Sequence, residues 1–277
     1  MLTALGGLLL TLDIPLIRLG EGETWSVLMV RSFATFVSGL GLWGILKLTG
    51  RKPPSLMPGR AGLAVILLYA ASSVTFMVAV FLTPAANLVF ILAFNSAFAA
   101  ILSWIFLKER PHSYTLAAIT VMIGGVLLIV SDGISRGHWA GDLAALLSAI
   151  FIATAITVSR ASGRDMGLTA LSGAIIPALV GAAMVWQNGY QIENPGWILF
   201  NGLLVIPAAF YFLATGPRWI SGPEVAMFYL LETVLAPIWI WMIFAETPTS
   251  RTLAGGAVLI VTLVIHSAWQ LAATRKA

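Results

Sequence analysis

The chain contains no cysteine among its 277 residues, so it has no disulfide and no thiol chemistry. It has only three histidines, and no His-Glu-x-x-His or other metal-ligand spacing. A nucleotide-binding loop of the Gly-x-x-x-x-Gly-Lys-Ser/Thr type is also missing from the sequence. These absences argue against an enzyme and against an ATP-driven pump, and they predict neither a metal ion nor a cofactor.

Charge is scarce as well. Only 9% of the residues are charged and 59% are hydrophobic, whereas a soluble domain carries about 25% charged residues. The apolar residues fall in runs of roughly 20, which is the length of helix that crosses a hydrocarbon core ~30 Å thick. The sequence therefore predicts an all-α polytopic membrane protein with the lipid bilayer as a partner. The net charge of +4 is expected to set orientation in the membrane, and no nucleic-acid partner is predicted.

Ten membrane spans are expected, separated by short breaks that carry Gly, Pro, Asn and Asp. Their approximate ranges are 2–19, 24–46, 61–82, 85–107, 113–131, 140–158, 168–187, 196–216, 223–244 and 251–272. If the N-terminus is cytoplasmic, the inner loops and tail hold eleven Lys and Arg residues and the outer loops hold three. The positive-inside rule then predicts that both termini are cytoplasmic.

One long segment of the chain occurs twice. Residues 84–129 align without a gap with residues 221–266, and 11 of the 25 positions from 99 to 123 are identical. The matches include Trp and then Glu-x-Pro-x-Ser-x-Thr-Leu-Ala in register. We therefore expect two repeats, 1–133 and 134–277, of five spans each. Because five is odd, the two copies enter the membrane in opposite directions, as in many secondary transporters with a midplane substrate site.

Glu232 and Asn95 occupy equivalent positions of the two repeats. Glu232 lies ten residues into its span, ~15 Å deep by helical rise and near the bilayer centre. A carboxyl group in such a place can load and release a proton near neutral pH. We interpret Glu232 as a substrate-binding or coupling group with Asn95 as its partner across the repeat. The alternative is a hydrogen-bonded glutamate that only locks helices together.

Asp13 and Arg31 are the second candidate pair. Both are expected ~10 Å below the outer surface on adjacent spans, so they should form an ion pair. The pair is either structural or opens to hold a charged substrate. Asn87 is a further candidate, equivalent to Glu224, near the start of the fourth span. Glu109 and Glu246 are expected to accept hydrogen bonds from the amides of the helices that follow them.

Aromatic residues accompany these polar groups at membrane depth. Those deep enough to line a cavity are Phe94, Tyr211, Tyr229, Trp239 and Trp241. Packing alone would also explain an aromatic stripe. Together with a carboxylate, the same rings would suit a cationic or aromatic small molecule.

The chain resembles the EamA-type branch of the drug/metabolite transporter superfamily over essentially its whole length. The resemblance rests on ten spans in two repeats and on a span that ends in Phe-Leu-Lys-Glu-Arg-Pro, followed by Thr-Leu and Ile-Gly-Gly-Val. Pro84, Asn87, Arg31 and Glu109 match the family pattern, but Thr-Leu-Asp-Ile-Pro, with Asp13, replaces the usual Trp-Gly of the first span. The resemblance implies a bacterial inner-membrane carrier that moves amino acids, other metabolites or drugs, often outward.

The leading hypothesis is a secondary transporter that works by alternating access, with spans 1–4 and 6–9 around the cavity. Spans 5 and 10 are then peripheral and available for a homodimer, and protons are coupled through Glu232. Two related hypotheses are an uptake carrier and an uncoupled facilitator for a polar or cationic metabolite. A channel or a non-transporting membrane protein is the hypothesis from a different class.

Overall fold

The structure is a computed structural model that describes residues 2–50, 53–215 and 222–274. These residues form helices and turns, and no strand occurs among them apart from an isolated bridge between Gly22 and Ile192. Eight helices in the described ranges are long and apolar enough to cross a membrane, where the sequence predicted ten. They are Thr24–Leu48, Gly59–Leu82, Ala85–Leu107, Ser113–Ser135, Trp139–Ser162, Thr169–Asn188, Pro195–Leu213 and Ser250–Ala272.

The helical elements follow one another without any domain between them. In the first half they are α1 (Leu2–Leu10), α2 (Asp13–Leu19), α3 (Thr24–Leu48), α4 (Gly59–Leu82), α5 (Ala85–Ala93), α6 (Asn95–Leu102), the π-helix η1 (Ser103–Leu107) and α7 (Ser113–Ser135). In the second half they are α8 (Trp139–Ser162), α9 (Thr169–Gly173), α10 (Ile175–Asn188), α11 (Pro195–Phe200), the π-helix η2 (Asn201–Val205), α12 (Ile206–Thr215), α13 (Gly222–Phe244) and α14 (Ser250–Thr274).

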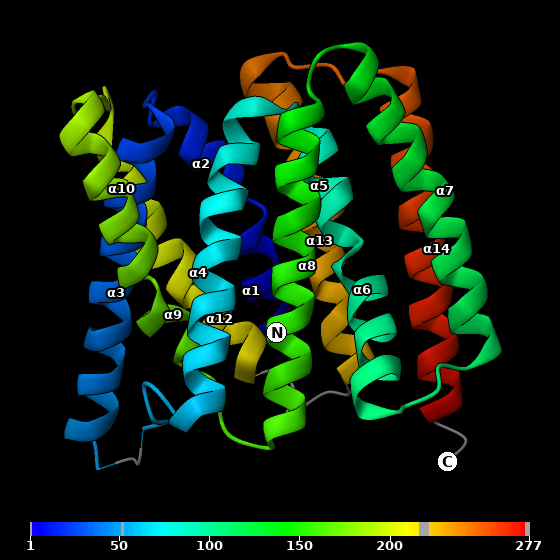
Figure 1. The fold of residues 1–277 in the computed structure, drawn as a ribbon, viewed down its shortest axis with the longest axis horizontal. Coiled ribbons are helices and arrows are strands. Elements are labelled where there is room, and N and C mark those ends of the chain that lie inside the picture. The colour runs from blue at the N-terminus through cyan, green and yellow to red at the C-terminus, as the bar shows by residue number, and fades with distance from the viewer. Residues whose placement is uncertain (1, 51–52, 216–221, 275–277) are drawn as a thin grey trace.

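The helices run side by side in one bundle (Figure 1). α3 and α10 pack together along one edge, and α7 packs with α14 along the opposite edge, while α4 and α8 lie between these edges. The turn between η1 and α7 lies at the lower edge of the view, and the turn between α13 and α14 lies at the upper edge (Figure 1). The two repeated sequence segments therefore make their turns at opposite ends of the bundle.

Two predicted spans are not among these eight helices. The first is divided into α1, of 9 residues, and α2, of 7 residues, by a turn at Thr11 and Leu12. The amides of these two residues bond the carbonyl groups three positions back, at 3.2 and 3.1 Å, instead of four. The ninth forms one helix, α13, of 23 residues, and Leu230–Phe244 is the apolar part of it that lies among the fully described residues.

Several other spans are continuous in length but irregular inside. α5 gives way to α6 at Phe94, and α9 gives way to α10 at Ala174. The π-helices η1 and η2 interrupt the ladders of the fourth and eighth spans. Irregular backbone at membrane depth is tolerated where it lines a cavity or is covered by protein. The breaks place Asp13, Asn95 and Asn201 each at the first residue of a new segment.

The centre of the bundle is held by close packing of small side chains. Ala145, Ala149 and Ala153 of α8 are fully buried where α8 meets α4. At the same contact the hydroxyl groups of Ser72 and Ser148 lie 2.9 Å apart and bond one another. Small residues let helix backbones approach closely, and serine hydroxyls then hold them together inside lipid. This contact joins the first half of the chain to the second.

The contact between α7 and α14 depends on glycine. A Cβ atom added to Gly255 would lie 2.6 Å from the carbonyl oxygen of Gly125. We expect Gly255→Val to push the two helices apart and to destabilise the protein by about 1–3 kcal/mol, as overpacking does. Gly124→Val is the matched control, because its Cβ would meet nothing within 4 Å. Thermal unfolding in detergent measures the difference, and equal losses in the two variants would contradict the close contact.

Candidate functional site

A cavity of about 780 Å³ lies inside the bundle. Side chains of most of the helical elements line it, among them α2, α3, α4, α6, α8, α12 and α13, and it extends from Asp13 and Arg31 to the loop that holds Glu109 and Arg110. Its volume is within the roughly 300–1,000 Å³ typical of small-molecule sites. Both halves of the chain contribute walls, as the sequence predicted for a site between the repeats.

Asp13 and Arg31 form the ion pair that their expected depth predicted. One guanidinium nitrogen, Nη2, donates to both carboxylate oxygens of Asp13 at 3.0 and 2.9 Å. Nε of Arg31 donates to Oδ1 of Asn201 at 2.9 Å, and Nδ2 of Asn201 donates to Oδ1 of Asp13 at 2.8 Å. The guanidinium carbon also lies 5.6 Å from the ring centre of Phe76. Arg31 is only 9% exposed and Asp13 is 5% exposed, so the three polar residues form one closed, charge-balanced cluster.

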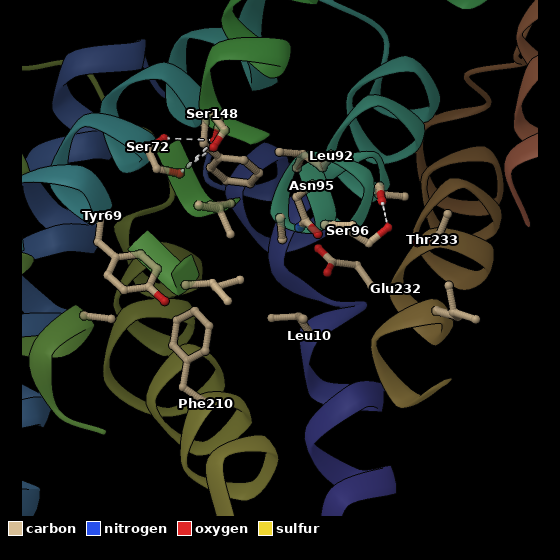
Figure 2. A pocket seen from close by; sticks show the side chains of 18 of the residues that line it. Leu10, Tyr69, Ser72, Leu92, Asn95, Ser96, Ser148, Phe210, Glu232 and Thr233 are labelled. Atoms are coloured by element: carbon tan, nitrogen blue, oxygen red, sulfur yellow. Dashed lines mark hydrogen bonds between the residues drawn. The ribbon is translucent and has the colours of Figure 1, made fainter. Parts of the chain in front are cut away.

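Glu232 and Asn95 lie on the cavity wall without such a network. Figure 2 shows the carboxyl group of Glu232, from α13, directed toward Asn95 at the start of α6. Neither side chain makes a hydrogen bond or an ion pair with any residue in the described part of the chain. Asp13 and Arg31 border the same cavity. The two residues that the repeat paired are thus together in the cavity, with polar atoms available to a solute.

The structure adds lining residues that the sequence analysis missed. Ser32 follows Arg31 on α3, and its hydroxyl group is buried without a partner among the described residues, yet it borders the cavity. Tyr69 of α4 and Phe210 of α12 supply aromatic rings to the wall (Figure 2). Asn201, which joins the Asp13 cluster, was missed although an asparagine inside an apolar span was a usable signal.

Four of the five predicted aromatic residues do not border this cavity: Phe94, Tyr211, Trp239 and Trp241. Phe94 is 5% exposed and packs edge-on against Phe98 with ring centres 4.8 Å apart. Trp239 donates its indole N–H to the hydroxyl group of Thr11 at 3.1 Å, at the break between α1 and α2. Tyr211 is 37% exposed on α12 and does not border the cavity. The side chain of Tyr229 lies outside the described part of the structure.

Asn87 belongs to a polar cluster at the upper end of the bundle. Its Oδ1 accepts from Thr252 of α14 at 2.7 Å, and its Nδ2 donates to Asp142 of α8 at 3.4 Å. Thr83 donates to the same carboxylate oxygen of Asp142. The cluster therefore ties α5, α8 and α14 together outside the cavity.

Glu246 closes the same end of the bundle. Its Oε2 pairs with Arg18 of α2, and its Oε1 accepts the backbone N–H of Ala85, at the first position of α5, at 2.8 Å. Arg18 also donates to the backbone carbonyl groups of Val80 and Thr83, each at 3.3 Å. We call this set of contacts the Arg18–Glu246 latch. The prediction that Glu246 would satisfy the helix after it is wrong, because its carboxylate bonds α2 and α5 instead.

At the lower end of the bundle, residues of the loop between η1 and α7 border the cavity. Glu109 pairs there with Arg160 of α8 at 2.9 Å, and both side chains are about half exposed. Glu109 therefore does not bond the helix that follows it, contrary to the prediction. Tyr114 of α7 and His266 of α14 also border this end. Spans 5 and 10 thus contribute to the cavity mouth, where the sequence analysis placed them only at the periphery.

A polytopic helical bundle that surrounds a ligand-sized cavity, with polar groups at membrane depth, defines a membrane transport protein. The chain belongs to the EamA-like transporter family, whose sequence model matches residues 1–131 and again residues 139–268. The family resemblance inferred from the sequence is therefore confirmed. This family consists of transporters of small solutes and not of enzymes, and the chain is a multi-pass membrane protein.

Two further comparisons agree with this assignment. The chain is 26% identical over 194 residues to human solute carrier family 35 member G1, in an alignment that covers 62% of this chain and 52% of the human protein. The chain thus spans about half the length of that relative. A solved crystal structure matches with a TM-score of 0.68 over 95% of both chains, at 15% identity. That likeness shows the fold alone.

Proposed function

We propose that this protein is a secondary transporter that exports a small organic metabolite across the bacterial inner membrane by alternating access. The observation that carries the proposal is the cavity, which reaches the middle of the bundle from one end while the Arg18–Glu246 latch closes the other. Such a cavity gives a solute access from one side of the membrane at a time. The positive-inside rule assigns the open end, with both termini, to the cytoplasm.

In this proposal, the two inverted repeat units move against each other to change which side of the membrane the site faces. Two separate matches to one family model support two related units, 1–133 and 134–277. The turns of the repeated segments at opposite ends of the bundle support their opposite orientation (Figure 1). Rocking of one unit against the other would close the end of the cavity at Glu109 and open the end held by the Arg18–Glu246 latch, around a fixed central site. The outer faces of α7 and α14 would carry the homodimer contact.

The side chains have distinct roles in the proposed cycle. The closed cluster of Asp13, Arg31 and Asn201 forms a fixed, charge-balanced wall. Glu232 and Asn95 bind the solute, because their polar atoms face the cavity. Glu232 also exchanges its bound solute for a proton, so that a proton gradient drives export. Loss and gain of a proton at the solute-binding carboxyl group is the simplest way to couple the flux of solute to the flux of protons.

The test uses purified protein in liposomes. Uptake of labelled phenylethylamine, phenylalanine and citrate is measured with and without the same unlabelled solute inside. A carrier predicts that at least one solute enters faster when unlabelled solute is present on the far side, because the loaded site returns faster than the empty one. Uptake of all three at the level of empty liposomes would contradict transport of these solute classes, and uptake without this acceleration would favour a channel.

The latch itself gives a prediction. Replacing Glu246 with Ala removes the acceptor of the Ala85 amide and the partner of Arg18. We expect the α4–α5 turn, residues 80–88, to exchange its amide hydrogens several-fold faster, because local opening becomes easier. Hydrogen exchange with mass spectrometry measures this change. Glu193→Ala, at an exposed glutamate of the loop before α11, is the matched control, and equal exchange in both variants would show that the latch does not close this end.

A further inference from the structure

We infer that the solute is an organic cation with an apolar body, such as a protonated or quaternary amine, and that Glu232 supplies its counter-charge. The inference rests on the proposed transport function and names the solute class that the same cavity accepts. It depends on two features: the balance of charge around the deep part of the cavity and the position of the aromatic rings.

In the deep part of the cavity, Glu232 supplies a carboxyl group that no cation of the described residues pairs with. Arg31 is already committed, since two of its nitrogens bond Asp13 and Asn201. Glu232 has no hydrogen-bonding or ion-pair partner in the described ranges, although it borders the cavity. An unpaired charge at membrane depth is costly, and a ligand with one positive charge removes that cost. An anion would instead meet two carboxyl groups and an arginine whose charge is already matched.

The apolar and aromatic side chains around Glu232 suit the apolar body of an organic cation. Tyr69 and Phe210 face the cavity from α4 and α12, Leu10 lies between these rings and Glu232, and Leu92 lies beside Asn95 (Figure 2). Aromatic faces attract cations within about 6 Å of the ring centre. Phe76 already has such a contact with the guanidinium group of Arg31. An ammonium group beside Glu232 and Asn95 would thus leave its apolar substituents against Leu10 and the two rings.

Protons should compete with the cation for the same carboxylate. α13 packs against α1, α2, α5 and α14; of these, α1 and α5 contain no ionisable side chain. The ionisable groups that face the cavity around Glu232 are Asp13 of α2, Arg31 of α3, Tyr69 of α4 and His266 of α14. Asp13 is already paired with Arg31, so Glu232 is the carboxyl group in this part of the cavity that is left for a proton or a cation. Cation affinity should therefore fall as the pH is lowered.

The experiment compares three compounds that share a phenyl group and differ in charge. They are phenethyltrimethylammonium, phenylalanine and 4-phenylbutyrate, titrated calorimetrically into the purified full chain on either side of neutral pH. We expect only the cation to bind the wild type well, and more weakly at the lower pH. Glu232→Gln should lose at least about 10-fold in affinity, the factor that 1.4 kcal/mol produces. Glu193→Gln should leave the affinity unchanged.

Equal affinity for the cation in wild type and Glu232→Gln would overturn the inference, as would preferential binding of 4-phenylbutyrate or phenylalanine. If Glu232→Gln does not fold, Glu232→Asp replaces it: it keeps the charge but withdraws it by one methylene, so weaker cation binding with the same pH dependence is expected. The liposome experiment separates the two proposals. Exchange of citrate or phenylalanine without cation binding would refute the solute class and leave transport standing, whereas no exchange of any solute would count against transport itself.

Discussion

Replacing Glu232 with Gln is expected to abolish solute flux driven by a pH gradient. Glutamine keeps the size and hydrogen-bonding capacity of the side chain but cannot lose or gain a proton. Because Glu232 borders the cavity and makes no bond within the described structure, the substitution removes no contact that holds the bundle together. Flux into liposomes after a pH jump should therefore fall to the level of empty liposomes, while thermal unfolding stays close to that of the wild type.

The matched control is again Glu193→Gln, which makes the same chemical change at an exposed loop position and should leave the flux unchanged. Full pH-driven flux in Glu232→Gln would exclude this carboxylate as the coupling group. If that variant also unfolded at a much lower temperature, Glu232 would have the purely structural role that the sequence left open.

Replacing Arg31 with Met should be the most damaging single change to stability. It leaves Asp13 as a buried carboxylate without its cation and Asn201 without one of its donors. Removing one partner of a buried ion pair typically costs about 3–5 kcal/mol. The double variant Asp13→Asn with Arg31→Met should recover most of this loss, because no unpaired charge remains and an amide can still bond Asn201. Equilibrium unfolding in mixed micelles measures the three variants.

An exposed ion pair provides the control for the predicted loss of stability in Arg31→Met. Arg160 and Glu109 form a pair of similar length, but their side chains are 54% and 49% exposed. Arg160→Met should therefore change stability by no more than about 1 kcal/mol. If Arg31→Met cost no more than Arg160→Met, water would have to reach Arg31 and Asp13, and the cluster would not be the closed wall that the proposed mechanism uses.

Depth in the membrane could be predicted from the sequence, because the span limits give each residue a height. That is why the pairing of Asp13 with Arg31 was predicted correctly, and why Glu232 and Asn95 were expected together. The direction in which a side chain points could not be predicted in the same way. Lipid and protein interior are both apolar, so the hydrophobic pattern does not separate the lipid-facing side of a span from its buried side. The sequence analysis therefore named Tyr211 as a cavity residue, whereas its neighbour Phe210 is the one that borders the cavity.

Two of the breaks in the helices have a sequence signal, because Pro15 and Pro177 cannot donate to the carbonyl groups four residues back, at Thr11 and Gly173. The break at Phe94 has no Pro or Gly beside it and could not be predicted in this way. The partners of Glu109 and Glu246 were missed for a related reason. Local rules favour a bond to the next helix start, but arginines from distant parts of the chain, Arg160 and Arg18, bring a full charge to the same carboxylates.

The most direct test of the account is whether one point in the cavity can be reached from both sides of the membrane in turn. The natural absence of cysteine makes this possible without other changes, since Ser73→Cys places the only thiol of the protein on the cavity wall. Sealed vesicles are treated with a membrane-impermeant maleimide from the inner or the outer face. Alternating access predicts labelling from either face, with Glu246→Ala increasing outer labelling and decreasing inner labelling. Labelling from one face only, unchanged by Glu246→Ala, would contradict the account.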